Sequence, residues 1–91
     1  MSAFEGNMIR VGKKPVMNYV MACVTLFNSG SNEIIIRARG TAITKAVDIT
    51  EMFRRSFAKD LIIKSIKVGS EDIKRMQEEF PISTIEIVLT K

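Results

Sequence analysis

One arrangement occurs twice in this chain: a short strand-like segment runs into a glycine, and a segment with helical periodicity follows. Apolar positions alternate weakly over residues 8–11, and Gly12 breaks that pattern. The β-branched run within residues 33–39 leads into Gly40 in the same way. Two strands that each feed a helix are typical of an α/β architecture, in which helices cover a sheet.

The two glycines are each followed by a predicted helix. Pro15 suits the first position of the first helix, because its missing N–H costs nothing there, and Gly30 suits a left-handed cap after its end. Thr41 is a plausible N-cap for the second helix, which we expect to reach about Lys59. The positions that keep the helical period are Val16, Val20, Val24 and Phe27, widened by Met17 and Met21, and then Ile43, Val47, Thr50, Phe53 and Phe57. Because the first helix is apolar around most of its circumference, we expect it to be buried on more than one side.

The C-terminal half predicts two further strands, residues 61–68 and 82–90. The charged stretch between them, residues 69–81, is long for a hairpin connection and predicts a functional or mobile loop. Residues 1–7 mix small and polar types and predict a flexible tail. The order is therefore βαβαββ, and the fold class is an α/β sandwich: one domain over residues 8–91, with two helices on one face of a mixed four-stranded sheet.

The composition excludes several classes of protein. The 91 residues contain one cysteine and no histidine, which argues against an internal disulfide framework, a Cys/His zinc site and His-dependent catalysis. We therefore expect no metal and no cofactor. The longest mainly apolar run, residues 16–27, is shorter than the roughly 20 residues of a membrane span, and it has no signal-peptide cleavage site. A cytoplasmic protein without membrane contact is expected, with Cys23 as a small core residue.

The net charge of +4 is concentrated in the first half of the chain. Residues 1–47 carry six basic and two acidic side chains, whereas residues 48–91 carry eight of each. Because net charge governs partners rather than fold, this asymmetry indicates a surface that faces a polyanion.

The sharpest local feature is Gly12-Lys13-Lys14-Pro15, which places two cations at the start of a helix. A helix N-terminus has free N–H groups and a partial positive charge, so it already attracts phosphate. Lysines there oppose the helix dipole, and phosphate binding would explain their presence. The alternative is a pair of solvated loop lysines.

The second basic cluster begins at Arg37 and Arg39, which alternation places on one face at the end of their strand, and continues to Lys45. Both glycine turns follow strands and begin helices, so we expect them to lie at the same edge of the domain and the two clusters to converge. Several phosphates would then be within reach of one patch. The alternative is that both arginines pair with surface carboxylates. Tyr19, one turn into the first helix, could stack on a base or contact a phosphate, or it could be a half-buried structural residue.

Three segments together resemble the Alba family of archaeal chromatin proteins: GKKPVMNY at residues 12–19, RARGTAITKAVD at 37–48 and STIEIV at 83–88. The resemblance runs in one register over residues 8–91. It implies the βαβαββ fold, a stable homodimer and sequence-independent binding of double-stranded DNA, with RNA also bound.

The resemblance also implies roles for single residues. The positions it assigns to nucleic-acid binding, together with their neighbours, are Arg10, Lys13, Lys14, Asn18, Tyr19, Arg37, Arg39, Thr41 and Lys45. Thr41 stands where many members have a basic residue. Lys13 falls on a lysine that is acetylated in some members, which implies acetylating and deacetylating enzymes as partners, and Phe57 falls where dimers pack against one another. Residues 69–81 correspond to a β-hairpin arm, whose Lys74 and Arg75 are outnumbered by acidic residues for a net charge of −2.

The leading hypothesis is a non-enzymatic, chromosome-associated architectural protein that coats and compacts DNA as a dimer. Its acidic arm predicts weaker binding than in relatives with basic arms. The alternative is an RNA-binding protein, either an RNA chaperone or a subunit of an RNase P-like particle. A phosphate-handling enzyme that uses an arginine is a third hypothesis, disfavoured by the lack of histidine and of a nucleophile motif.

Overall fold

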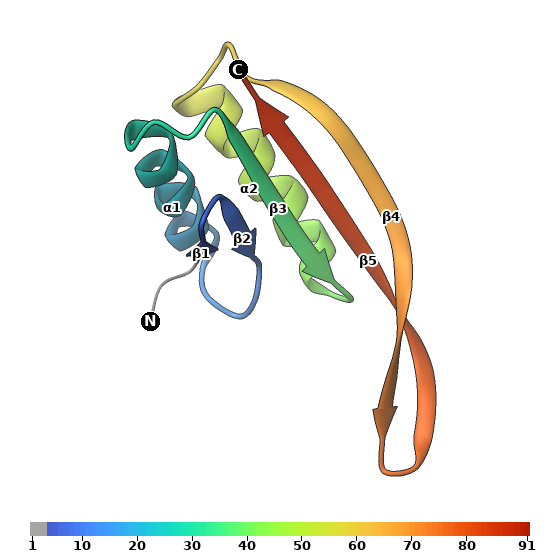
Figure 1. The fold of residues 1–91 in the computed structure, drawn as a ribbon. Helices are drawn as coiled ribbons and strands as arrows, with labels where there is room; N and C mark the ends of the chain where they lie inside the picture. Colours follow the sequence, from blue (N-terminus) through green and yellow to red (C-terminus); the bar gives the residue numbers. More distant parts are fainter. Residues whose placement is uncertain (1–3) are drawn as a thin grey trace.

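A computed structural model describes residues 4–91. Its elements are β1 (Phe4–Glu5), β2 (Met8–Arg10), α1 (Val16–Asn28), β3 (Glu33–Arg39), α2 (Ala42–Ser56), β4 (Ile62–Arg75) and β5 (Glu78–Thr90). The strands form one mixed sheet in the order β1-β2-β3-β5-β4, in which only β2 and β3 pair in parallel. Both helices pack on one face of this sheet, and the predicted βαβαββ sandwich is confirmed (Figure 1).

The N-terminal segment differs in part from the flexible tail expected over residues 1–7. Residues 1–3 lie outside the described residues. Phe4 and Glu5 pair with Ile9 and Met8 in a short antiparallel β1–β2 ladder, which adds a fifth strand at the edge of the sheet.

Helix α1 begins and ends where its sequence signals indicate, within one residue. Pro15 takes the N-cap position with φ −59° and ψ 152°, so the first helical residue is Val16 rather than the proline. At the other end Gly30 has φ +99° and donates its N–H to the Phe27 carbonyl, while the Ser31 N–H reaches the Leu26 carbonyl. This pair of bonds is a Schellman motif, and it confirms the left-handed cap predicted at Gly30.

The core lies between the helices and the central strands. Ile9, Ile34, Ile36 and Leu89 of the sheet are at most 1% exposed, and they face buried residues of both helices. The rings of Phe27 and Phe53 meet edge to face with centroids 5.9 Å apart, which joins α1 to α2.

Helix α1 is covered by the sheet on one side and by α2 on another, as predicted, while Met17 and Met21 on its remaining surface are nearly half exposed. Helix α2 buries a stripe of Ala46, Ile49, Thr50 and Phe53. Successive residues lie about 100° apart on a helix, so Val47 falls at the border of this stripe and is 44% exposed.

Helix α2 also ends earlier than predicted. Its last residue is Ser56 rather than Lys59, because the N–H groups of Phe57 and Ala58 both bond to the Phe53 carbonyl and turn the chain. That turn leaves Phe57 49% exposed at the C-cap.

The charged stretch 69–81 is not a loop. Strands β4 and β5 pair from Ile62 and Thr90 to Arg75 and Glu78, and Met76 and Gln77 close the hairpin with φ of 51° and 69°. Its outer part extends past the rest of the domain and gives the molecule a longest dimension of 45 Å (Figure 1). The hairpin arm implied by the family resemblance is therefore confirmed. In the described part of the chain, no helix has the length and apolar character to cross a membrane.

Candidate nucleic-acid interface

The two strand-to-helix turns lie side by side, as predicted. Strands β2 and β3 run parallel with Arg10 opposite Arg37, so the residues that follow them emerge at one edge of the sheet. The ammonium group of Lys45, in the first turn of α2, donates hydrogen bonds to the carbonyl oxygens of Gly12 (3.0 Å) and Lys14 (2.8 Å). Lys13 and Lys14 are themselves exposed at this edge. The convergence of the two basic clusters is confirmed.

Tyr19 holds the first turn from inside the protein. Its side chain is 3% exposed, and its hydroxyl oxygen accepts the N–H of Gly12 at 2.8 Å and of Lys14 at 3.3 Å. Of the two roles considered for Tyr19, the geometry therefore fits a structural residue, and the buried ring is not available for stacking on a base. Asn18, its neighbour on α1, is exposed.

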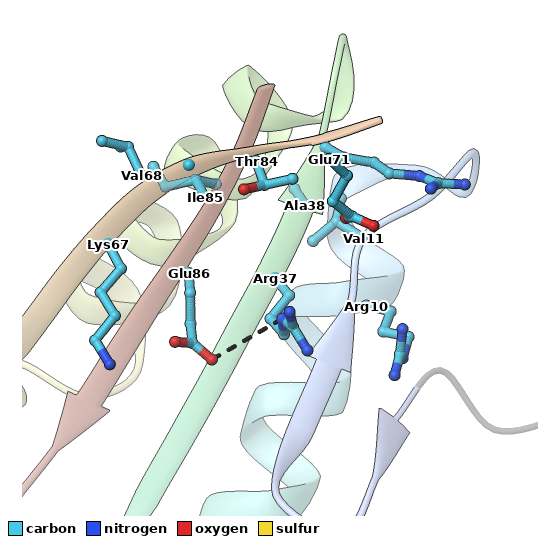
Figure 2. Close-up of a pocket in the computed structure, with 12 residues that line it drawn as sticks. Arg10, Val11, Arg37, Ala38, Lys67, Val68, Glu71, Thr84, Ile85 and Glu86 are labelled. Carbon is cyan, nitrogen blue, oxygen red and sulfur yellow. Dashed lines mark ion pairs between the residues drawn. The ribbon is translucent and has the colours of Figure 1, made fainter. Parts of the chain in front are cut away.

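Three arginines and Lys67 lie on the face of the sheet opposite the helices. Arg10, Arg37 and Arg39 are exposed there and line a groove of about 650 Å³ together with Lys67 of β4 (Figure 2). Because β2 and β3 bring Arg10 and Arg37 into register, their guanidinium groups extend from neighbouring strands (Figure 2). The open sheet face therefore continues the basic surface that begins at the two turns.

Two carboxylates also line this groove, those of Glu71 and Glu86 (Figure 2). Glu86 lies opposite Arg37 in the β3–β5 register, and the Arg37 Nε and Glu86 Oε1 atoms are 3.9 Å apart. The alternative that both arginines pair with surface carboxylates is therefore met in part, by Arg37. At this distance, and with both side chains partly exposed, the pair contributes at most about 1 kcal/mol and leaves the guanidinium able to exchange partners. Among the side chains of residues 6–91, Arg39 has no ion pair.

The turn at Gly40 depends on the absence of a side chain. Gly40 has φ +57°, and a Cβ atom there would lie 2.9 Å from Cδ1 of Ile82. Thr41 occupies the predicted N-cap position and is exposed, but its side chain makes no capping hydrogen bond. Thr41 is therefore an exposed polar residue at the start of the helix that carries Lys45.

The remaining predicted residues lie away from the two turns. Lys74 and Arg75 are on the hairpin arm, where the register sets them opposite Glu79 and Glu78, so the tip is internally charge-balanced. Phe57 is at the end of α2 opposite Lys45, and the structure does not bring it to the basic surface.

Cys23 is a core residue, as predicted. It is fully buried, and desolvation raises the pKa of its thiol from 9.0 to about 12. In the part of the chain that the structure describes, no group of three or more His, Cys, Asp or Glu residues is arranged to hold a metal ion.

Comparison with known proteins gives this geometry its context. The model of the Alba family matches residues 7–70. The chain belongs to the Alba family. It is 49% identical to the DNA/RNA-binding protein Alba of Methanothrix thermoacetophila over 87 residues, which are 96% of this chain and 98% of that protein. It is 51% identical to the DNA/RNA-binding protein Alba of Picrophilus torridus over 88 residues, again 96% of this chain and 98% of that protein.

The solved structure of Alba from Thermoplasma volcanium has the same fold. It superimposes with a TM-score of 0.90 at 46% identity, and the match covers 93% of this chain and all of that one. The resemblance seen in the three sequence segments is therefore confirmed for family and fold. These Alba proteins are named for nucleic-acid binding and not for an enzymatic activity.

Two features of this Alba surface were missed from the sequence. Lys67 lines the groove because the β4–β5 register sets it opposite Glu86, which lies between Lys67 and Arg37 in the sheet. The hydrogen bonds from Lys45 to the first turn join positions 31 and 33 residues apart. Alternation along residues 61–68 could have placed Lys67 on the face opposite Ile66, but no local signal reports a contact of such long range.

Proposed function

We propose that this chain binds double-stranded DNA through its phosphate backbone, without reading the base sequence, and acts as an architectural protein of the chromosome. The observation that carries the proposal is the junction of the two turns, where Lys45 ties the α2 terminus to the turn that bears Lys13 and Lys14. Exposed lysines and arginines at one edge and one face can neutralise several phosphates at once. The names of the Alba relatives support nucleic acid as the ligand.

A homodimer is part of the proposal. Val68 and Ile66 of the edge strand β4 are 80% and 55% exposed. Val68 pairs with Ile85 and Ile66 pairs with Ile87, and Ile87 is buried under the helices. Because paired residues share a face of the sheet, Val68 and Ile66 lie on the side that carries the helices, but beyond the area that the helices cover. An apolar strand at a free edge favours association with a second copy, which would double the net charge to about +8 by addition.

The dimer has its own test. Sedimentation or light scattering at micromolar concentration should give twice the 10.2 kDa chain mass, and Val68→Asp should shift the equilibrium toward the monomer. The matched control is Val47→Asp, which adds the same charge at another exposed valine on α2. A monomer mass for the unchanged chain would remove the two-fold arrangement from the proposal.

Three finer expectations belong to the same proposal. Phe57, half exposed at the end of α2, is proposed to pack one dimer against the next along DNA. Acetylation of Lys13 would remove one charge per chain and weaken binding. The arm, balanced at its tip and acidic overall, is proposed to add little electrostatic affinity.

The experiment that tests the function is a salt titration of binding to a DNA duplex and an RNA duplex of equal length. Phosphate contacts predict that the logarithm of the affinity falls linearly with the logarithm of the salt concentration, alike for unrelated sequences. A strong dependence on DNA sequence would contradict backbone binding.

The second candidate function is RNA binding, favoured by the same surface and by the relatives' names, which include RNA. Competition between the two duplexes at one salt concentration separates the two candidates. A large preference for structured RNA would favour a role as an RNA chaperone or particle subunit.

A further inference from the structure

We infer that Tyr19 and Lys45 act as a clamp on the lysine turn, defined as Gly12–Lys14, and that they position Lys13 and Lys14 rather than serving mainly as nucleic-acid contacts themselves. The inference deepens the proposed function and rests on it. It assigns a role to the four hydrogen bonds that hold one short turn.

The lysine turn is bounded by fixed structure on both sides. The Val11 N–H bonds to the Arg37 carbonyl at 2.8 Å, which anchors the chain before the turn to β3. After the turn, Pro15 caps a helix that begins at Val16. Only Gly12, Lys13 and Lys14 therefore have backbone freedom that the sheet and the helix do not remove.

The two clamp side chains, Tyr19 and Lys45, both bind the backbone of Gly12 and of Lys14. The Tyr19 hydroxyl oxygen accepts the N–H groups of Gly12 and Lys14, and the Lys45 ammonium donates to their carbonyl oxygens. All four polar backbone groups of Gly12 and Lys14 are thus bound to two side chains. One side chain belongs to α1 and the other to α2, so the turn is fixed relative to both helices.

The geometry limits what Lys45 can do directly. An ammonium group has three N–H donors, and two are used at 3.0 and 2.8 Å. At most one remains for a phosphate, whereas the ammonium groups of Lys13 and Lys14 make no hydrogen bond or ion pair within the part of the chain that the structure describes. Tyr19 is 3% exposed and has no charge to offer. Both side chains therefore act through the lysine turn.

The benefit of such a clamp is preorganisation. A turn that is already ordered in the free protein loses little backbone entropy when its lysines meet phosphates, so more of the interaction appears as affinity. Removal of the clamp should weaken binding without changing the number of phosphates bound.

The test compares Tyr19→Phe and Lys45→Met with two matched controls. Thr50→Val removes another buried hydroxyl, which donates to the Ala46 carbonyl within α2, and Lys59→Met removes another lysine charge beyond the far end of α2. Binding to a DNA duplex is measured by fluorescence anisotropy over a series of salt concentrations. Each clamp variant removes two of the four hydrogen bonds that order the turn. It should bind about fivefold more weakly, a loss of about 1 kcal/mol, and the controls should bind like the parent.

The salt dependence separates positioning from direct binding. Removing a residue that touches a phosphate lowers the slope of log affinity against log salt concentration by about 0.9 for each phosphate that it neutralised. We expect the slope to stay unchanged in Tyr19→Phe and to fall by less than half that amount in Lys45→Met. A fall by the full amount in Lys45→Met would overturn its assignment as a positioning residue.

A double-mutant cycle shows whether the clamp acts through the lysines. In a chain carrying Lys13→Ala and Lys14→Ala, the further change Tyr19→Phe should cause no additional decrease in affinity. Additive decreases would overturn the clamp and leave the proposed function standing. If the lysine substitutions alone left affinity and slope unchanged, the proposed lysine surface would be wrong instead.

Amide hydrogen exchange of the free protein gives an independent readout. The Gly12 and Lys14 amides should be protected in the parent and exchange faster in both clamp variants, while thermal unfolding confirms that each variant is folded. Should Tyr19→Phe fail to fold, Lys45→Met decides the question, because its side chain lies near the surface. Faster exchange with unchanged affinity would overturn the inference.

Discussion

Replacing both Lys13 and Lys14 by glutamine should make DNA binding weaker and less sensitive to salt. Both side chains are exposed at the junction of the two turns, and each can neutralise one phosphate. On B-DNA each neutralised phosphate adds about 0.9 to the slope of log affinity against log salt concentration, so the slope of the variant should be smaller by about 1.8 per chain. When salt rises fourfold, from about 50 to about 200 mM, the ratio of the parent's affinity to the variant's affinity should then fall about twelvefold.

Dimerisation enlarges this effect. If both copies engage one duplex, four lysines are replaced and the slope falls by about 3.6. The ratio of the parent's affinity to the variant's affinity then falls about 150-fold over the same salt range. The assay is anisotropy with a labelled duplex at five or more salt concentrations. The matched control is Lys59→Gln with Lys64→Gln, which removes equal charge at the opposite end of the domain, where Lys64 pairs with Glu33 at 3.0 Å. An equal fall of the slope in the control would refute a localised lysine surface.

Three further predictions concern stability and reactivity. Phe53→Ala should lower the free energy of unfolding by about 3–5 kcal/mol, measured in urea, because Phe53 is fully buried; a decrease below about 1 kcal/mol would contradict the described core. Replacing Met76-Gln77 by Asn-Gly should raise the unfolding temperature, since both residues have positive φ that Asn-Gly adopts more readily, and an unchanged melting curve would argue against this turn. The Cys23 thiol has a pKa raised from 9.0 to about 12 in the folded state, so stability should fall as pH rises from about 9 to about 12, where only the unfolded state ionises; Cys23→Ser should flatten that pH dependence, and an unaltered profile would contradict the assignment.

The convergence of the two basic turns was predictable because it follows from topology. Two strands that each feed a helix on the same face of a sheet release their turns at the same edge, whatever the side chains are. The residues needed for that inference, Gly12 and Gly40, are visible in the sequence. The bond from Lys45 to the first turn was not predictable, since it depends on how α2 sits against α1.

The strands of the hairpin arm could not be predicted from the pattern of apolar and polar residues. Alternation marks a strand only when one face is buried, and between Ile66 and Phe80 every residue is exposed except Ile73, which is partly exposed. The turn at Met76 and Gln77 also lacks the glycine that normally marks a tight hairpin. Only the family resemblance predicted the strands of the arm.

The ion pair of Arg37 illustrates a third limit. The sequence places Arg37 on the open face of the sheet, but its partner Glu86 is set by the register between β3 and β5. Register depends on the packing of Ile34 and Ile36 against the helices, which no local pattern reports.

The position of β3 at the centre of the sheet has a consequence for the order of folding. Its neighbours are β2, which precedes it in the chain with α1 between them, and β5, whose Leu89 pairs with Ile34 across more than half the sequence. Strand β3, which contributes Ile34 and Ile36 to the core and bears two of the arginines, therefore pairs on one side only until β5 has been synthesised. Closing such a long-range pair is the slow event in chains of this size, so the arginine face should form late, together with the arm. A nascent chain truncated before β5 would expose Ile34 and Ile36 at an open edge, which makes it the species most exposed to aggregation and to chaperones.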